Sequence, residues 1–267
     1  MTAFRLLRIV LGTLVVTFLL APILAILPLA FTDSVFLSYP VKGFSDRWFE
    51  ELLTNDSWRR SILNSLLIGG GATTIATVLG TMAALGLRGD KVPLAGLWRT
   101  GFILPMVVPP VVLGVGMQIL YVRLGLASTY LGVMIGHAVL GIPFVVVTVS
   151  TALAGIDRAI ERSALSLGAS PARTFLAVTL PLALPGIVSG AVFAFAISLD
   201  EVILTLFLAG PDQRTLARQM FSTIRENISP AVASAALVLI VGTLVFAGLT
   251  ALLRSRQARQ ARATSTS

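Results

Sequence analysis

The residues from Leu131 to Leu153 read LGVMIGHAVLGIPFVVVTVSTAL, a run of 23 residues without a charged side chain. A helix that crosses the hydrocarbon core of a bilayer needs about 20 apolar residues, so this run predicts a membrane span. Five further apolar runs predict five more spans. We therefore expect an all-α membrane protein in which residues 1–267 form a single transmembrane domain. The six predicted spans lie at residues 9–31, 61–87, 101–122, 131–153, 182–209 and 231–253.

The composition of the whole chain supports this prediction. Of the 267 residues, 56% are hydrophobic and 12% are charged, whereas a soluble domain carries about 25% charged residues. A soluble protein is therefore excluded, and the abundance of apolar residues also excludes a disordered chain. The chain has no cysteine, which rules out disulfides, iron–sulfur clusters and thiolate metal sites.

The loops between the spans carry unequal charge. Six spans place both termini on one side, which holds 12 basic and three acidic residues, whereas the opposite side holds eight basic and seven acidic residues. The positive-inside rule therefore predicts that both termini lie in the cytoplasm. The net charge of +8 then reports orientation, and nucleic acid is not expected as a partner. The basic residues on the predicted cytoplasmic side are Arg5, Arg8, Arg88, Lys91, Arg99, Arg158, Arg162, Arg173, Arg254, Arg256, Arg259 and Arg262.

Two of the loops are long and patterned. The outer loop 32–60 holds Trp48 and Trp58, which favour an interfacial helix on the outer membrane face. The inner loop 154–181 has apolar residues at helical spacing and charged residues on the opposite face, which predicts an amphipathic helix ending at Gly168. That helix either lies on the inner leaflet or docks on a cytoplasmic partner, and its pattern does not separate the two.

Small residues and prolines indicate how the spans pack. Gly186 and Gly190 form a small-xxx-small pair, which we expect to serve close packing inside the bundle rather than a dedicated dimer interface. Prolines remove backbone hydrogen bonds, and membrane helices tolerate such breaks where protein or a water-filled cavity satisfies the freed carbonyls. This favours a transporter over a simple anchor. The prolines of the third span are Pro105, Pro109 and Pro110.

Two adjacent acids lie in the fifth predicted span, at Asp200 and Glu201. Ionisable groups within a membrane are rare and mark functional sites by default. No lysine or arginine within the six runs neutralises them, so we expect them to contact a cationic substrate, with Ser198 and Thr205 as added oxygen acceptors. A polar kink or an ion pair between helices is the structural alternative. Gln118 and Tyr121, one turn apart in the third span, are weaker candidates for the substrate pathway.

Catalytic chemistry is sparse in this chain. His137 is the only histidine, and we expect it to be a packed, hydrogen-bonded residue. A zinc site would need more ligands, so no metal or cofactor is expected. A phosphate-binding loop needs Gly-Lys-Ser/Thr, and neither Lys42 nor Lys91 occurs in that context. If ATP drives transport, the ATPase is therefore another polypeptide, and the chain itself is not an enzyme.

The stretch 161–181 reads ERSALSLGASPARTFLAVTLP and resembles the EAA loop of permease subunits in bacterial ABC importers. The front of the motif departs from the family pattern, because Arg162 occupies the family's glutamate position, Ser163 the first alanine position, and Glu161 lies one residue early. The rest is in register, with Val178 in place of isoleucine. The residues in register are Ala164, Gly168, Leu180 and Pro181.

Further stretches are similar to the second permease subunit of spermidine/putrescine importers. The resemblance covers nearly the whole chain and implies the type I importer permease fold, in the bacterial inner membrane. It also implies a homologous partner permease, two cytoplasmic ATPase subunits and a periplasmic solute-binding protein. The stretches are residues 41–50, 55–58, 64–66, 198–203 with Phe207 and Gly210-Pro211, and 229–232.

The same resemblance implies roles for the inner loop. Its helix, within 157–170, would be the coupling helix that fits a groove on the ATPase subunit, with Glu161, Ala164, Gly168, Ala169 and Pro181 as coupling residues. The substrate would be a polyamine or a related cationic solute. Related permeases handle opines, other amines, thiamine and ferric iron, so the substrate stays open at this point.

Two other classes of protein stay open from the residues alone. A secondary transporter would use Asp200 and Glu201 for protons or sodium and would need no ATPase. An intramembrane hydrolase would use His137 with a serine.

Overall fold

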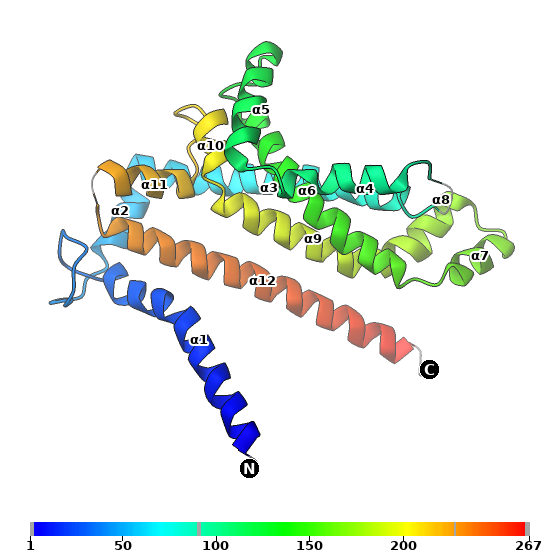
Figure 1. Cartoon of the computed structure of the whole chain (residues 1–267), viewed down its shortest axis with the longest axis horizontal. Coiled ribbons are helices and arrows are strands. Elements are labelled where there is room, and N and C mark those ends of the chain that lie inside the picture. Colours follow the sequence, from blue (N-terminus) through cyan, green and yellow to red (C-terminus); the bar gives the residue numbers. More distant parts are fainter. Residues whose placement is uncertain (1–2, 90–91, 227, 265–267) are drawn as a thin grey trace. The chain divides into compact units, whose positions relative to one another are not determined.

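A computed structural model describes residues 3–89, 92–226 and 228–264, and these residues are almost entirely helical (Figure 1). The expected all-α class is confirmed. The helices are α1 (Ala3–Ala30), α2 (Arg47–Thr54), α3 (Asp56–Gly86), α4 (Ala95–Ile103), the 3₁₀ turn η1 (Leu104–Met106), α5 (Pro110–Leu124), α6 (Tyr130–Ala154), α7 (Arg158–Ser166), α8 (Pro171–Thr174), the π-helical turn η2 (Phe175–Thr179), α9 (Leu180–Asp200), α10 (Ile203–Leu208), α11 (Leu216–Glu226) and α12 (Ala231–Thr264).

Five helical segments among the described residues are long and apolar enough to cross a membrane. They match the first, second, fourth, fifth and sixth predicted spans. The fifth begins earlier than predicted, because α8, η2 and α9 form one helical segment from Pro171 to Asp200. Lys91 lies outside the described residues, as do the side chains of Arg254, Arg256, Arg259 and Arg262.

The third predicted span, 101–122, is not one straight helix. It is divided between α4 with η1 and α5, and the two parts are bent by 99°. Proline explains the break: Pro105 and Pro109 have no N–H to donate, and a residue that precedes proline is driven out of the α region. The backbone of Pro109, which precedes Pro110, is accordingly extended, with ψ of 131°. The six predicted spans are thus five helical spans and one bent pair.

The described contacts divide the chain into two compact units, residues 1–59 with 219–242 and residues 60–218 with 243–267. In the larger unit, α6 and α9 lie side by side (Figure 1) and share a core of small and branched side chains. Gly186 and Gly190 make this possible, because a Cβ at either position would meet the α6 backbone at 2.8 Å. This glycine pair therefore packs inside the bundle, as predicted.

In the smaller unit, α12 is joined to the end of α1. Ser234 Oγ donates a 2.7 Å hydrogen bond to the carbonyl of Ala30, and both residues are fully buried. The helix predicted in the outer loop exists as α2, but its tryptophan does not face the membrane surface. Trp48 is 5% exposed and Trp58 is 4% exposed. Both indoles are thus packed inside the protein, where their large apolar area is removed from water.

Candidate functional site

Asp200 and Glu201 lie where the fifth predicted span breaks into two helices. α9 ends at Asp200, the backbone of Glu201 is extended, and α10 begins at Ile203. The expected single helix over 182–209 is therefore wrong. No proline or glycine marks this break. Instead, the Glu201 carboxylate accepts a 2.7 Å hydrogen bond from the Leu204 N–H, which satisfies one of the unpaired donors at the start of α10.

The two carboxylates have no cationic partner in the described part of the chain. Asp200 is exposed and Glu201 is half-buried, and neither forms an ion pair with a lysine or arginine of that part. A carboxylate within an apolar span is costly to keep ionised, and a bound cation offsets that cost. The two acids therefore stay candidates for contact with a cationic substrate.

Ser198 and Thr205 do not add acceptors to these acids, contrary to our prediction. Both hydroxyls bind His137, with Ser198 Oγ 2.8 Å from Nδ1 and Thr205 Oγ1 3.0 Å from Nε2. All three side chains are at most 3% exposed. His137 is thus the packed, hydrogen-bonded residue that we expected, and it joins α6 to both sides of the break.

Both ring nitrogens of His137 are hydrogen-bonded, and Thr205 Oγ1 also donates to the carbonyl of Glu201, at 3.0 Å. All three side chains therefore have hydrogen-bond partners. Ser198 is 3% exposed and His137 is 1% exposed, so a substrate cannot reach the serine and the arrangement does not serve a hydrolase.

Arg218 holds the other end of α10. Its Nη1 donates to the carbonyls of Thr205, Ala209 and Gly210, at 3.2, 2.9 and 3.4 Å. A cation at the C-terminal end of a helix satisfies its last carbonyls and stabilises the helix dipole. This contact was not predicted, since nothing in the sequence pattern shows that α11 returns to α10.

Gln118 and Tyr121 lie on α5, which packs against α10. Tyr121 is 3% exposed in a cluster with Leu204 and Leu208. Gln118 Oε1 and the Tyr121 hydroxyl are buried and have no hydrogen-bond partner among the described residues. Buried polar atoms normally find partners, so these two oxygens are available to water or to a ligand. The structure therefore places these candidates beside the helix that follows the acids.

The inner loop forms the predicted helix, α7, and glycine ends it. The N–H groups of Gly168 and Ala169 donate to the carbonyls of Leu165 and Ala164, at 3.0 and 3.1 Å, a Schellman motif. Gly168 has a φ of +88°, which L-residues adopt only at a cost. Three of the predicted coupling residues thus belong to one helix cap.

Glu161 joins α7 to the ends of two spans. Its Oε1 accepts hydrogen bonds from Arg88, which follows α3, and from Thr179, just before α9, both at 2.5 Å. Burial by itself raises the pKa of the Glu161 carboxyl, but these hydrogen bonds and the charges of Arg88 and Arg158 outweigh it, so that the pKa falls below its ordinary value of 4.5. Glu161 is therefore ionised at neutral pH and holds α7 in place.

The stretch from η2 to Pro181 connects α7 to the fifth span. Pro181 occupies the first turn of α9 and has no N–H to donate backwards. The turn before it is π-helical, a form that occurs often at functional sites. Thr179, the last residue of that turn, supplies the hydrogen bond to Glu161.

The outer side of α7 presents apolar side chains. Ile160 is 48% exposed, and Leu167, seven residues later at the C-cap and so on the same face, is 89% exposed, whereas the Glu161 carboxylate accepts hydrogen bonds from Arg88 and Thr179. Within its unit, α7 lies beyond the ends of α6 and α9 (Figure 1). This arrangement offers an apolar surface to another body, such as a partner subunit.

A protein-family model described as "Binding-protein-dependent transport system inner membrane component" matches residues 76–259. The chain belongs to this family. The predicted location in the inner membrane and the predicted class, a transport subunit, are thereby confirmed. The match gives no support to the ion-coupled alternative.

Curated relatives agree over most of the chain. The putrescine transport system permease protein PotI of Escherichia coli is 34% identical and aligns over 91% of this chain and 89% of its own length. The spermidine/putrescine transport system permease protein PotC of Haemophilus influenzae is 31% identical and aligns over 90% of this chain and 93% of its own length. The molybdenum transport system permease protein ModB of Mycobacterium bovis is 33% identical and aligns over 82% of this chain and 90% of its own length. The predicted resemblance to polyamine permeases is confirmed.

A solved structure shares the fold. A bacterial ABC transporter involved in the import of the acidic polysaccharide alginate matches with a TM-score of 0.71 and 14% identity, over 92% of this chain and 94% of that chain. The predicted importer permease fold is confirmed.

Proposed function

We propose that the chain is the permease subunit of an ATP-driven importer that carries a polyamine or a related small cation. It pairs with a homologous permease, two cytoplasmic ATPase subunits dock at α7, and a periplasmic binding protein delivers the substrate. Both termini lie in the cytoplasm. In this topology the bent pair α4–α5 crosses the membrane once.

The observation that carries the substrate class is the pair of acids at the α9–α10 break. The names of PotI and PotC indicate polyamines, but the similarly related ModB is named for molybdenum, so relatedness by itself does not choose the charge of the substrate. Asp200 and Glu201 indicate that the substrate is positively charged, because two adjacent carboxylates attract a cation and repel an oxyanion such as molybdate.

Neutralising the acids tests this proposal. In the full importer, Asp200→Asn and Glu201→Gln are each expected to raise the KM for putrescine uptake about ten- to hundred-fold, the range for a lost hydrogen bond to a charged group. Glu201→Gln retains an oxygen for the Leu204 N–H, so α10 keeps its cap. Asp212→Asn, a loss of charge at an exposed acid, is the matched control. Unchanged uptake in both variants would refute the carboxylate site.

The docking role of α7 rests on its Schellman cap and its exposed apolar side. A bulky residue at Gly168 is expected to weaken the attachment of the ATPase. Copurification of the ATPase with the permease pair, measured for wild type and variant, reports this directly. A variant that assembles and transports as well as wild type would rule out this docking site.

A further inference from the structure

Three threonines of α3 have buried hydroxyl groups without a hydrogen-bond partner. Thr73, Thr77 and Thr81 follow one another at intervals of four residues and form a threonine row, in which no Oγ1 bonds to a described residue. Threonine in a helix commonly donates to the carbonyl four residues earlier, as Thr74 does to Gly70 at 2.9 Å. A buried hydroxyl that lacks a partner costs free energy, so three of them on one face of a membrane span indicate a functional site.

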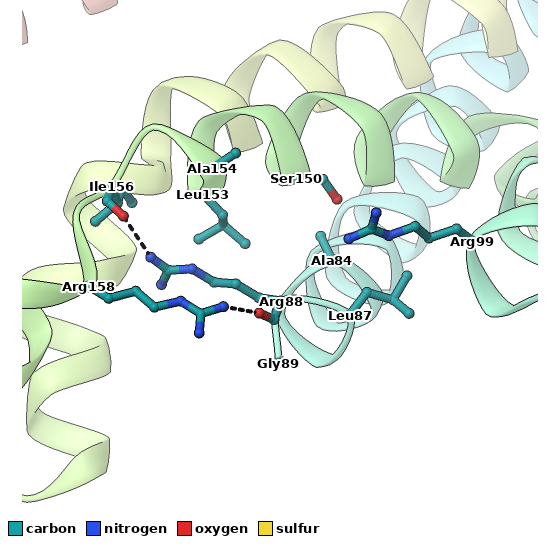
Figure 2. A pocket seen from close by; sticks show the side chains of 10 residues that line it. All are labelled: Ala84, Leu87, Arg88, Gly89, Arg99, Ser150, Leu153, Ala154, Ile156 and Arg158. Atoms are coloured by element: carbon teal, nitrogen blue, oxygen red, sulfur yellow. Dashed lines mark hydrogen bonds between the residues drawn. The ribbon is translucent and has the colours of Figure 1, made fainter. Parts of the chain in front are cut away.

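The packing of α3 places the threonine row at the edge of its buried face. Ala72 and Ala76, each one residue before a threonine of the row, are buried in a core shared with α6 and α9. Thr74, on the other side of the row, is exposed. Successive residues of a helix are turned by about 100°, so the row lies between the two. Figure 2 shows the far end of the buried face, where Ala84 and Leu153 of α6 line a cavity of about 520 Å³.

The threonine row begins close to the two acids of the proposed substrate site. Gly69, one turn before Thr73, lies against α9, because a Cβ at this glycine would be 3.0 Å from the ring of Phe195 and 3.7 Å from Leu199. Leu199 directly precedes Asp200. From this level the row continues toward the α7 end of the bundle over eight residues, which is about 12 Å along a helix. In the proposed topology this is the direction in which an imported substrate moves.

We propose that the threonine row lines the substrate route through this chain, next in line after Asp200 and Glu201. The proposal rests on the proposed function. A hydroxyl oxygen accepts hydrogen bonds from the N–H groups of an ammonium, and the row offers such an oxygen about every 6 Å. A cation that leaves the acids therefore keeps a polar partner inside the apolar span, where an unpartnered charge is very costly.

The position of the row at the edge of the buried face explains how it becomes accessible. The three hydroxyl oxygens are covered in this structure, so the substrate reaches them when neighbouring helices slide. Small sliding movements of packed helices are a common form of conformational change. Because Ala72 and Ala76 carry the main contact with α6 and α9, an edge row is uncovered while that contact stays packed.

Replacing a hydroxyl by a methyl group of similar shape tests the proposal. In the full importer, Thr77→Val is expected to lower the maximal rate of putrescine uptake about ten-fold, the smaller effect of losing a hydrogen bond to a charged group. The KM is expected to change little, since the acids still bind the substrate first. The melting temperature is expected to stay equal or to rise, because the variant removes an unpartnered buried hydroxyl.

Two variants serve as controls. Thr77→Ser keeps the hydroxyl and is expected to retain most of the rate, and Thr74→Val changes the exposed threonine that bonds to its own helix. A wild-type rate in Thr77→Val, or an equal loss in Thr74→Val, would overturn the proposal. So would failure of the partner permease to copurify when all three threonines are valine, because the row would then be a contact between the two permeases.

Thiol labelling separates this proposal from the proposed function. Since the chain has no native cysteine, Thr77→Cys in the reconstituted importer reports access of a small cationic thiol reagent. We expect labelling with ATP and binding protein to differ from labelling without ATP, and Thr74→Cys to label equally in both. Labelling of Thr77→Cys that ignores ATP contradicts the threonine row alone. Labelling that depends on ATP in an importer that does not carry putrescine supports the row and contradicts the proposed substrate.

Discussion

His137 shows how a single residue fixes the α9–α10 break, where we propose that the substrate binds. Its two ring nitrogens bind hydroxyls on α9 and α10, which are Ser198 and Thr205. Glu201 caps α10 between them. The break that presents Asp200 and Glu201 is therefore held from both sides by the hydrogen bonds of His137.

A double-mutant cycle tests this arrangement. His137→Leu leaves two buried hydroxyls without their partner and is expected to destabilise the protein by about 1–3 kcal/mol. In a Ser198→Ala, Thr205→Val background the same change is expected to cost much less, because no partner is left unsatisfied. Thermal unfolding of the purified protein measures both steps. Equal costs in the two backgrounds would show that these hydrogen bonds do not hold the break.

Residue-level prediction succeeded where the signal was local. The burial of His137 followed from its place in an apolar run, but its partners lie 61 and 68 residues away and depend on how α9 and α10 pack. Arg88 and Glu161 likewise lie 73 residues apart. Such pairs become visible only once the helices are placed.

α7 is the element through which we expect ATPase motion to enter the chain. Glycine caps its end, Glu161 ties it to the ends of α3 and α9, and its apolar side chains stay exposed. The cap was predictable from Gly168 and Pro171. The π-helical turn and the α9–α10 break were not, because neither η2 nor the break contains a proline or glycine within it.

Gly168→Ala tests the cap by conformation alone. A Cβ at this position meets nothing within 4 Å, so the expected cost, roughly 1–2 kcal/mol, comes only from the left-handed backbone. We expect less ATPase to copurify with Gly168→Ala than with wild type. Gly168→Asn is the control, since asparagine tolerates this conformation and is expected to retain more ATPase. If more ATPase copurified with Gly168→Ala than with Gly168→Asn, the left-handed conformation at the cap would not be the cause of the loss.

The Glu161 contact predicts a dependence on pH. Folding lowers the pKa of this carboxyl below 4.5, so its contribution to stability is complete above that pH and is lost as the pH falls through the lowered pKa. The difference in melting temperature between wild type and Glu161→Gln is therefore expected to be constant near neutral pH and to shrink under acid conditions. Glu50→Gln, at an exposed acid, serves as control. A difference that persists at low pH would contradict the ionic contact.

At the scale of the whole molecule, the proposed topology depends on how α4 and α5 cross the membrane. Apolar runs predicted five spans well, because length and lack of charge suffice for a straight helix. The prolines of the third span indicated a break, but a 99° bend depends on packing that sequence does not show. Counting the bent pair as one crossing places α5's end outside and α7 inside.

The absence of native cysteine makes this topology directly testable. Leu124→Cys, at the exposed end of α5, is expected to react with a membrane-impermeant thiol reagent added outside intact cells. Ser163→Cys, on α7, is expected to react only after the membrane is opened. Labelling of both positions from the same side would show that α4 and α5 re-enter rather than cross.

The most direct test of the central claim is uptake of radiolabelled putrescine into proteoliposomes that contain the full importer. We predict accumulation only when ATP is enclosed and the binding protein is added outside, with no accumulation of molybdate under the same conditions. Uptake that proceeds without ATP on an ion gradient, or accumulation of molybdate in place of putrescine, would contradict the account.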